Sequence, residues 1–219
     1  MSYGEPIALR GQVELDQAAV ATSGDVRATA ETQFIERLKA GDEEAFDQLV
    51  EERTGDVYAL LYRMTSDPEE ARDLTQETFL RTFQNIKRFR GDADLKTWIY
   101  RIAVNQARNR WRWWRRRRRD VTVSLDAGDS HHEETVGSRL RDWSSPDPEQ
   151  QTLAHEREKA LMTGLSSLSR PYRETVILRD IEGLSYEEIA TTLEISVGTV
   201  KSRLARGRNE LRVKLGSSF

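Results

Sequence analysis

The amino-acid sequence predicts an all-α protein with two small helical domains joined by a flexible linker. The chain has 219 residues, of which 32% are charged and 8% aromatic, and this composition favours two small domains over one thick core. Apolar residues recur at helical spacings of three and four on both sides of a segment that lacks such spacing. We therefore expect a disordered N-terminal tail over residues 1–30, a first domain over 31–118, a linker over 119–152 and a second domain over 153–219.

The first domain is expected to begin with helices separated by tight turns. Gly41 followed by Asp42 predicts a helix stop and a new N-cap. A further helix starts after Asp67, which can cap it, with Pro68 at its first position. Spacings of four and three along this helix predict a buried stripe, made of Thr75, Phe79, Phe83 and Ile86.

A second face of the same helix is acidic and lies beside that stripe. Its members are Asp73, Gln76, Glu77 and Leu80. Most faces of this kind are simply solvated, and a docking surface is the alternative. The residues alone do not choose between the two.

A long helix is expected from about Leu95 through the stretch NQARNRWRWWRRRRRD. Its apolar stripe consists of Leu95, Trp98, Ile99, Ile102, Ala103 and Ala107. Another face carries basic side chains interrupted by an amide, namely Arg101, Asn105, Arg108 and Arg112.

Positive charge is concentrated in this part of the chain. Residues 88–119 hold twelve arginines and lysines against Asp92 and Asp94, although the net charge of the whole chain is -3. Arginines among tryptophans suit nucleic acid, because they attract phosphates while aromatic rings stack on unpaired bases. The favoured interpretation combines these: the tryptophans pack, Arg108 and Arg112 face nucleic acid, and the five consecutive arginines attract it without sequence preference. Tryptophans that merely extend the apolar stripe, and a membrane-surface role, are the alternatives.

The second domain carries the signals of a helix-turn-helix. Gly183 stops one helix, Ser185 and Glu188 form a capping box for a short second one, and Ser196 caps a third. The exposed sides of the third helix hold residues that can donate to guanine edges or phosphates: Thr199, Lys201, Ser202, Arg203 and Arg206. Duplex DNA binding is the favoured interpretation, and a basic solvated helix is the alternative.

Several function classes lack support in the sequence. There is no cysteine, and the adjacent His131 and His132 lack the ligand spacing of a zinc site, so no metal is expected. No phosphate-binding glycine loop, nucleophile elbow or metalloprotease motif occurs, which argues against an enzyme and against a cofactor. The first thirty residues show neither a secretory signal nor a membrane span, so we expect a cytoplasmic protein without direct membrane insertion.

Three motifs, in order, resemble the extracytoplasmic-function sigma factors, group 4 of the sigma-70 family. They are DPEEARDLTQETFLRTF, FRGDADLKTWIYRIAVNQARN and LRDIEGLSYEEIATTLEISVGTVKSRLARGR. The resemblance implies that the first domain is a sigma-2 helical bundle and the second a sigma-4 helix-turn-helix domain. Such a protein directs core RNA polymerase to promoters, recognises their -35 and -10 elements and promotes melting. A stand-alone helix-turn-helix regulator, and an RNA- or membrane-binding adaptor, are the rival functions.

The resemblance also implies roles for individual residues. The acidic face with Asp73, Gln76, Glu77 and Leu80 corresponds to the surface for the β′ clamp helices of the polymerase, and the β flap is a further contact. Residues 88–97 correspond to the loop that receives a base flipped from the -10 element, which Asn105 reads. The -10 set is Arg88, Trp98, Arg101, Asn105, Arg108 and Arg112. The -35 set is Arg179, Thr199, Lys201, Ser202, Arg203 and Arg206. An anti-sigma factor is expected as another partner.

Overall fold

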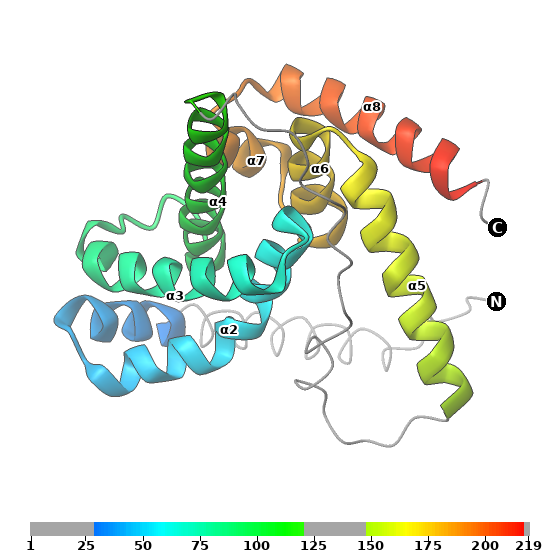
Figure 1. Cartoon of the computed structure of the whole chain (residues 1–219). Helices are drawn as coiled ribbons and strands as arrows, with labels where there is room; N and C mark the ends of the chain where they lie inside the picture. The colour runs from blue at the N-terminus through cyan, green and yellow to red at the C-terminus, as the bar shows by residue number, and fades with distance from the viewer. Residues whose placement is uncertain (1–28, 121–147, 217–219) are drawn as a thin grey trace, which may run out of the picture. The chain divides into compact units, whose positions relative to one another are not determined.

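The structure is a computed structural model that describes residues 29–120 and 148–216, and every regular element in these ranges is helical (Figure 1). A helical segment over residues 29–40 precedes the labelled helices. These are α2 (Glu43–Thr65), α3 (Pro68–Asn85), the 3-10 turn η1 (Ile86–Arg88), α4 (Leu95–Asp120), α5 (Pro148–Ser167), α6 (Arg170–Val176), the π-helical turn η2 (Ile177–Ile181), α7 (Tyr186–Leu193) and α8 (Val197–Leu215). The predicted all-α class is confirmed.

The domain boundaries expected from the sequence fall partly outside the described residues and stay predictions. Residues 1–28 of the expected tail and 121–147 of the expected linker lie outside the described residues, as do the paired histidines. Helix α5 begins at Pro148, inside the range that the sequence assigned to the linker. By their contacts the residues divide into two compact units, 1–49 and 50–219.

The turn before α2 is built as expected. Gly41 has a φ of +85°, in the left-handed region where a residue without a Cβ is favoured. The Asp42 carboxylate accepts a hydrogen bond from the Ala45 N–H at 3.1 Å and one from the Arg37 guanidinium at 2.7 Å. The predicted helix stop and N-cap are thus confirmed.

Helix α3 also starts at its predicted cap, but its buried side differs from the prediction. The Asp67 carboxylate accepts from the N–H groups of Glu69 and Glu70 at 2.9 and 3.0 Å. The buried residues are Ala71, Leu74, Thr75, Thr78, Phe79 and Thr82. The assignment of Phe83 to the buried stripe is wrong, because its side chain is 52% exposed. Thr82 lies near the centre of the buried band. At about 100° per residue, Phe83 lies roughly 100° around the helix from Thr82 and so falls outside that band.

Helix α4 is buried over a wider band than its predicted apolar stripe. Tyr100 and Val104, which that stripe omits, are 1% and 0% exposed. The cause is a second neighbour, since α4 packs against α7 as well as against α3 (Figure 1). A helix covered on two sides buries more of its circumference than one that covers a single core.

The helix-turn-helix has the caps that the sequence predicts. Ser185 and Glu188 form a reciprocal capping box, and the Ser196 hydroxyl accepts from the Thr199 N–H at 3.2 Å. Between the two helices Glu194 adopts a φ of 56°, which reverses the chain. Helix α8 crosses α6 closely at Gly207, where a Cβ would lie 2.8 Å from the Val176 side chain.

Candidate nucleic-acid interface

The acidic face of α3 is a continuous exposed surface in the structure. Asp73 and Gln76 are exposed, Glu77 is half-buried and pairs with Arg81 at 2.7 Å, and Leu80 is 58% exposed. The misassigned Phe83 lies only about 60° around the helix from Leu80, so it extends the same surface. Phe83 follows Leu80 by three residues, and this spacing is the signal in the sequence that could have assigned Phe83 to the exposed surface. Two large apolar side chains in a rim of polar ones are typical of a protein-binding surface.

A pocket opens at the N-terminal end of α4 and gathers three of the predicted -10 residues. Arg88, Trp98 and Arg101 line it, together with Phe89, Arg90, Asp92, Ala93, Thr97, Glu187, Glu188, Thr191 and Thr192. The rings of Phe89 and Trp98 meet at a tilt of 57°, with their centroids 5.3 Å apart. One wall of the pocket therefore combines the Phe89–Trp98 ring pair with the guanidinium groups of Arg88, Arg90 and Arg101. Arg90 was not among the predicted residues. The opposite wall comes from α7.

Helix α7 and the turn before it are bonded to the inner part of α4, residues 95–108. The Thr97 hydroxyl donates to Glu188 at 2.9 Å, and the Tyr100 hydroxyl donates to Glu182 at 2.8 Å. The second oxygen of Glu182 lies 3.2 Å from the Arg63 guanidinium, and its side chain is only 8% exposed. No local sequence pattern pointed to these contacts, because the partners are as many as 119 residues apart.

The contacts between α4 and α7 accompany pKa shifts of one group on each helix, Tyr100 on α4 and Glu188 on α7. Burial of Tyr100, followed by its hydrogen bond to Glu182, raises the pKa of the phenol. Burial of Glu188 opposes ionisation, but hydrogen bonds from Ser185 and Thr97 outweigh it and lower the pKa of this carboxyl group. Glu188 is thus held as a carboxylate at the rim of the pocket.

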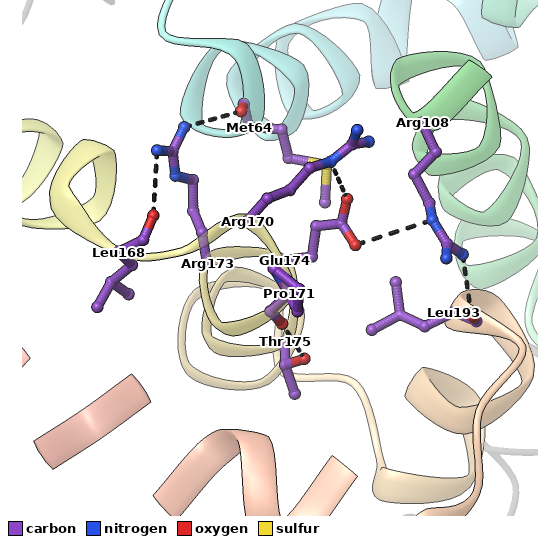
Figure 2. A network of polar contacts seen from close by, with 9 residues as sticks. All are labelled: Met64, Arg108, Leu168, Arg170, Pro171, Arg173, Glu174, Thr175 and Leu193. Carbon is purple, nitrogen blue, oxygen red and sulfur yellow. Dashed lines mark hydrogen bonds and ion pairs between the residues drawn. The ribbon is translucent and has the colours of Figure 1, made fainter. Parts of the chain in front are cut away.

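Arg108 takes part in a polar network that joins α4 to α6 and α7 (Figure 2). Its guanidinium donates to the Leu193 carbonyl at 2.9 Å and lies 3.9 Å from the Glu174 carboxylate, which also accepts from Arg170 at 2.5 Å. Arg173 donates to the Met64 carbonyl at 3.2 Å in the same network. The predicted basic face of α4 is consequently divided: Arg101 and Arg112 are exposed, Asn105 is half-buried, and Arg108 is bonded within the protein.

Five of the six predicted -35 residues lie together on α8. Lys201, Ser202 and Arg206 are exposed, and Thr199 and Arg203 are half-buried. The sixth, Arg179, lies in the π-helical turn, where it donates to the Leu184 carbonyl at 2.7 Å and stacks 5.0 Å from the Tyr186 ring. A hydrogen bond with Tyr172 raises the pKa of the Arg206 guanidinium. The start of α8 therefore presents a group of cationic and hydroxyl donors.

Among the helices in residues 29–120 and 148–216, none is both long enough and apolar enough to cross a membrane.

Comparisons with known proteins match both halves of this arrangement. Residues 49–119 match the model for sigma-70 region 2, and residues 158–211 match the model for sigma-70 region 4. The RNA polymerase sigma-H factor of Pseudomonas aeruginosa is 36% identical over 179 residues, which cover 82% of this chain and 90% of that protein. The ECF RNA polymerase sigma-E factor of Haemophilus influenzae is 35% identical over 182 residues, covering 83% and 93%.

A solved structure agrees with these relatives. The sigma factor RpoE of Bartonella quintana, in complex with the anti-sigma factor NepR, superposes with a TM-score of 0.57 at 26% identity and covers 78% of this chain and 96% of that one. The two region matches and the near-complete relatives agree with the resemblance in the three sequence motifs. The chain belongs to the extracytoplasmic-function sigma factors of the sigma-70 family, non-enzymatic proteins that serve RNA polymerase in transcription initiation.

Proposed function

We propose that this sigma factor recognises its promoter with two surfaces of different chemistry. The pocket at the start of α4 takes a base flipped out of the -10 element, and Asn105 hydrogen-bonds its edge. Arg101 and Arg108 hold the adjoining backbone. The exposed donors at the start of α8 bind the -35 element as intact duplex.

The composition of the pocket is the main support for this division. An aromatic pair can stack on an unpaired base, and Arg88, Arg90 and Arg101 supply charge for the phosphates beside it. Asn105 is not among the residues that line the pocket, but it follows the lining residue Arg101 by about one helical turn along α4. A face that is merely solvated needs neither the ring pair nor the surrounding arginines.

Binding of the base requires a change in the contacts of α7. Glu187 and Glu188 line the same pocket, and a carboxylate beside a phosphate backbone is repulsive. Arg108 must likewise leave the Leu193 carbonyl before it contacts DNA. We therefore place the observed arrangement before promoter binding.

The polymerase contacts follow from the other exposed surfaces. The α3 surface of Asp73, Gln76, Glu77 and Leu80 binds the β′ clamp helices, and the second helical domain binds the β flap. An anti-sigma factor is a further proposed partner, supported by the RpoE–NepR complex of the structural relative. A cytoplasmic location is part of the same proposal, because these partners act there.

Reconstitution with core RNA polymerase followed by genome-wide run-off transcription tests the proposal. The wild-type holoenzyme should initiate at a shared pair of elements, and Asn105→Ala should change the preference for one -10 base while other positions keep theirs. Identical preferences in a promoter library would overturn the role of Asn105. The rival stand-alone regulator predicts tight, specific duplex binding without polymerase and no initiation.

The α3 surface has its own test. The triple variant D73A/Q76A/E77A should co-purify poorly with core polymerase yet retain its thermal midpoint, because these side chains are off the buried band. The matched control is D47A/E51A/E156A, which removes three exposed acidic side chains elsewhere. Equal co-purification of both triple variants would reject the assignment of this surface.

A further inference from the structure

The outer end of α4, residues 109–117, exposes three tryptophans that the proposed function does not use. Trp111, Trp113 and Trp114 are 43%, 41% and 46% exposed. Tryptophan is usually well covered in soluble proteins, so three large exposed rings within four positions call for a partner. The explanation that these rings extend the apolar stripe does not fit their exposure.

Arginines stack on two of these rings from one helical turn further along. The Arg115 guanidinium lies 5.3 Å from the centre of the Trp111 ring, and that of Arg117 lies 4.9 Å from the Trp113 ring. Trp111 also has the Arg170 guanidinium of α6 at 4.6 Å. Stacking uses the flat face of a guanidinium and leaves its N–H edges for oxygen acceptors. The segment NRWRWWRRR contains no carboxylate. The arrangement therefore holds guanidinium groups in place without a neutralising acid within the segment.

The distribution of these side chains around the helix distinguishes between two kinds of anionic partner. At about 100° per residue, Trp113 lies roughly 160° around the helix from Trp111, and each has its stacked arginine beside it. A helix that lies on a membrane needs one apolar and one basic face, and here the two kinds of side chain are mixed around the circumference. Phosphates of a nucleic acid need no apolar face, so charge complementarity favours nucleic acid.

With α4 taken to lie along the DNA axis, helical geometry gives the distance between this segment and the base that Asn105 is proposed to read. From Asn105 to Arg117 the helix rises roughly 18 Å, at about 1.5 Å per residue. That length matches about five base pairs of B-form DNA at about 3.4 Å each. The proposed -35 surface on α8 follows α4 in the sequence, and the -35 element lies upstream of the -10 element, so we take the outer end of α4 as its upstream end.

We propose that the outer end of α4 binds the phosphate backbone of the duplex about five base pairs upstream of the flipped base, without reading sequence. Arg115 and Arg117 contact the phosphates. Trp111 and Trp113 are positioning residues that hold the two guanidinium groups. The inference rests on the proposed function, because Asn105 sets the register.

The test compares reconstituted holoenzymes that carry parent sigma factor or R115Q/R117Q on one promoter. Loss of two phosphate contacts should make the slope of log K against log[salt] shallower by about 1.8, because each contact contributes about 0.9. Hydroxyl-radical protection should disappear about five base pairs upstream of the flipped base. The control R53Q/R212Q removes two arginines outside the proposed site and should keep both the slope and the protection.

A second pair of variants tests the positioning role. Trp113→Phe keeps an aromatic face for Arg117 and should retain most of the affinity, whereas Trp113→Leu should lower it although Arg117 remains. Equal affinity of the two variants would remove the role of the ring.

The outcomes separate this inference from the function on which it rests. An unchanged salt slope and footprint in R115Q/R117Q would overturn the backbone contact, while base preference at the flipped position still reports on Asn105. A parent protein without that preference would refute the register itself. Sedimentation with phosphatidylglycerol vesicles that R115Q/R117Q abolishes, together with an unchanged promoter slope, would establish a lipid surface as the partner instead.

Discussion

The inner and outer parts of α4 have different surroundings although they belong to one helix. In the inner part, residues 95–108, polar side chains are bonded to α7 and its flanking turns: Thr97 to Glu188, Tyr100 to Glu182 and Arg108 to Leu193. In the outer end, Arg115 and Arg117 stack on exposed tryptophans of the same helix. Under the proposed function the inner part must exchange partners before it binds DNA, whereas Arg115 and Arg117 are exposed in the arrangement observed.

This difference separates electrostatic attraction of the DNA backbone from recognition of a base. Charge on an exposed helix end acts over roughly a Debye length, about 8 Å at physiological ionic strength, and needs no rearrangement. The proposed reading of a base in the pocket needs contact, and therefore needs α7 to leave. The same helix can thus meet duplex DNA with one end while its other end is still covered.

A covalent lock between α4 and α7 should have the largest effect on this comparison. The chain has no cysteine, so Thr97→Cys combined with Glu188→Cys creates a unique pair for a short bis-thiol crosslinker. Crosslinking makes the covered arrangement the only one available, so we expect promoter opening to fall by at least about tenfold. Permanganate reactivity of the -10 strand measures that opening.

The same preparation supplies the control for the lock. The double variant without crosslinker carries the same two substitutions, so its promoter opening is the reference against which the crosslinked form is compared. The crosslinked protein should still bind duplex DNA with salt-dependent affinity through its outer end. Full promoter opening by fully crosslinked protein would show that the inner part reads DNA with α7 in place.

Glu182→Gln should weaken the covered arrangement by a smaller amount. The Glu182 carboxylate is almost fully buried and accepts from both Arg63 and Tyr100, so loss of its charge costs about 1–3 kcal/mol of that contact. Faster hydrogen exchange in α7, with the remaining helices unchanged, is the expected measurement. Tyr100→Phe removes one of the two bonds and should give an intermediate rate. Unchanged exchange in both variants would show that these bonds do not hold α7.

The sequence predicted the parts of this arrangement that depend on neighbouring residues. The caps at Asp67, Ser185 and Ser196 each bond to a backbone N–H two or three positions away. The identity of the capping residue and its near neighbours is therefore enough to predict them. Phe83 was misassigned because spacings of four accumulate about 40° of drift per step and carry the residue off the buried band. The contact between Tyr100 and Glu182 joins residues 82 positions apart, and no periodic pattern contains it.

Arginines one turn apart in α4 should differ in their effect on stability. Arg108→Ala removes a bond to the Leu193 carbonyl and leaves the buried Glu174 with one cation fewer, so we expect a loss of about 1 kcal/mol. Arg112→Ala affects an exposed side chain that donates to the Asn109 side-chain oxygen on the same helix, and should stay within about 0.5 kcal/mol of the parent. Urea unfolding of both variants gives the comparison, and equal losses would remove the distinction between inner and outer arginines.

The smallest expected effect is a pH dependence at the junction of α7 with α4. Because its folded-state pKa is lowered, Glu188 stabilises the fold above its ordinary pKa of 4.5, and that contribution is lost as the pH falls through the lower folded-state pKa. Glutamine cannot titrate, so the Glu188→Gln variant should not show this loss of stability below about pH 4.5. Every other carboxyl group still contributes to the acid destabilisation of both proteins. The difference between the thermal midpoints of parent and variant, followed from pH 6 down to pH 3, isolates it. If that difference stays constant, the bonds from Ser185 and Thr97 do not favour the carboxylate, and Glu188 joins α7 to α4 through neutral hydrogen bonding alone.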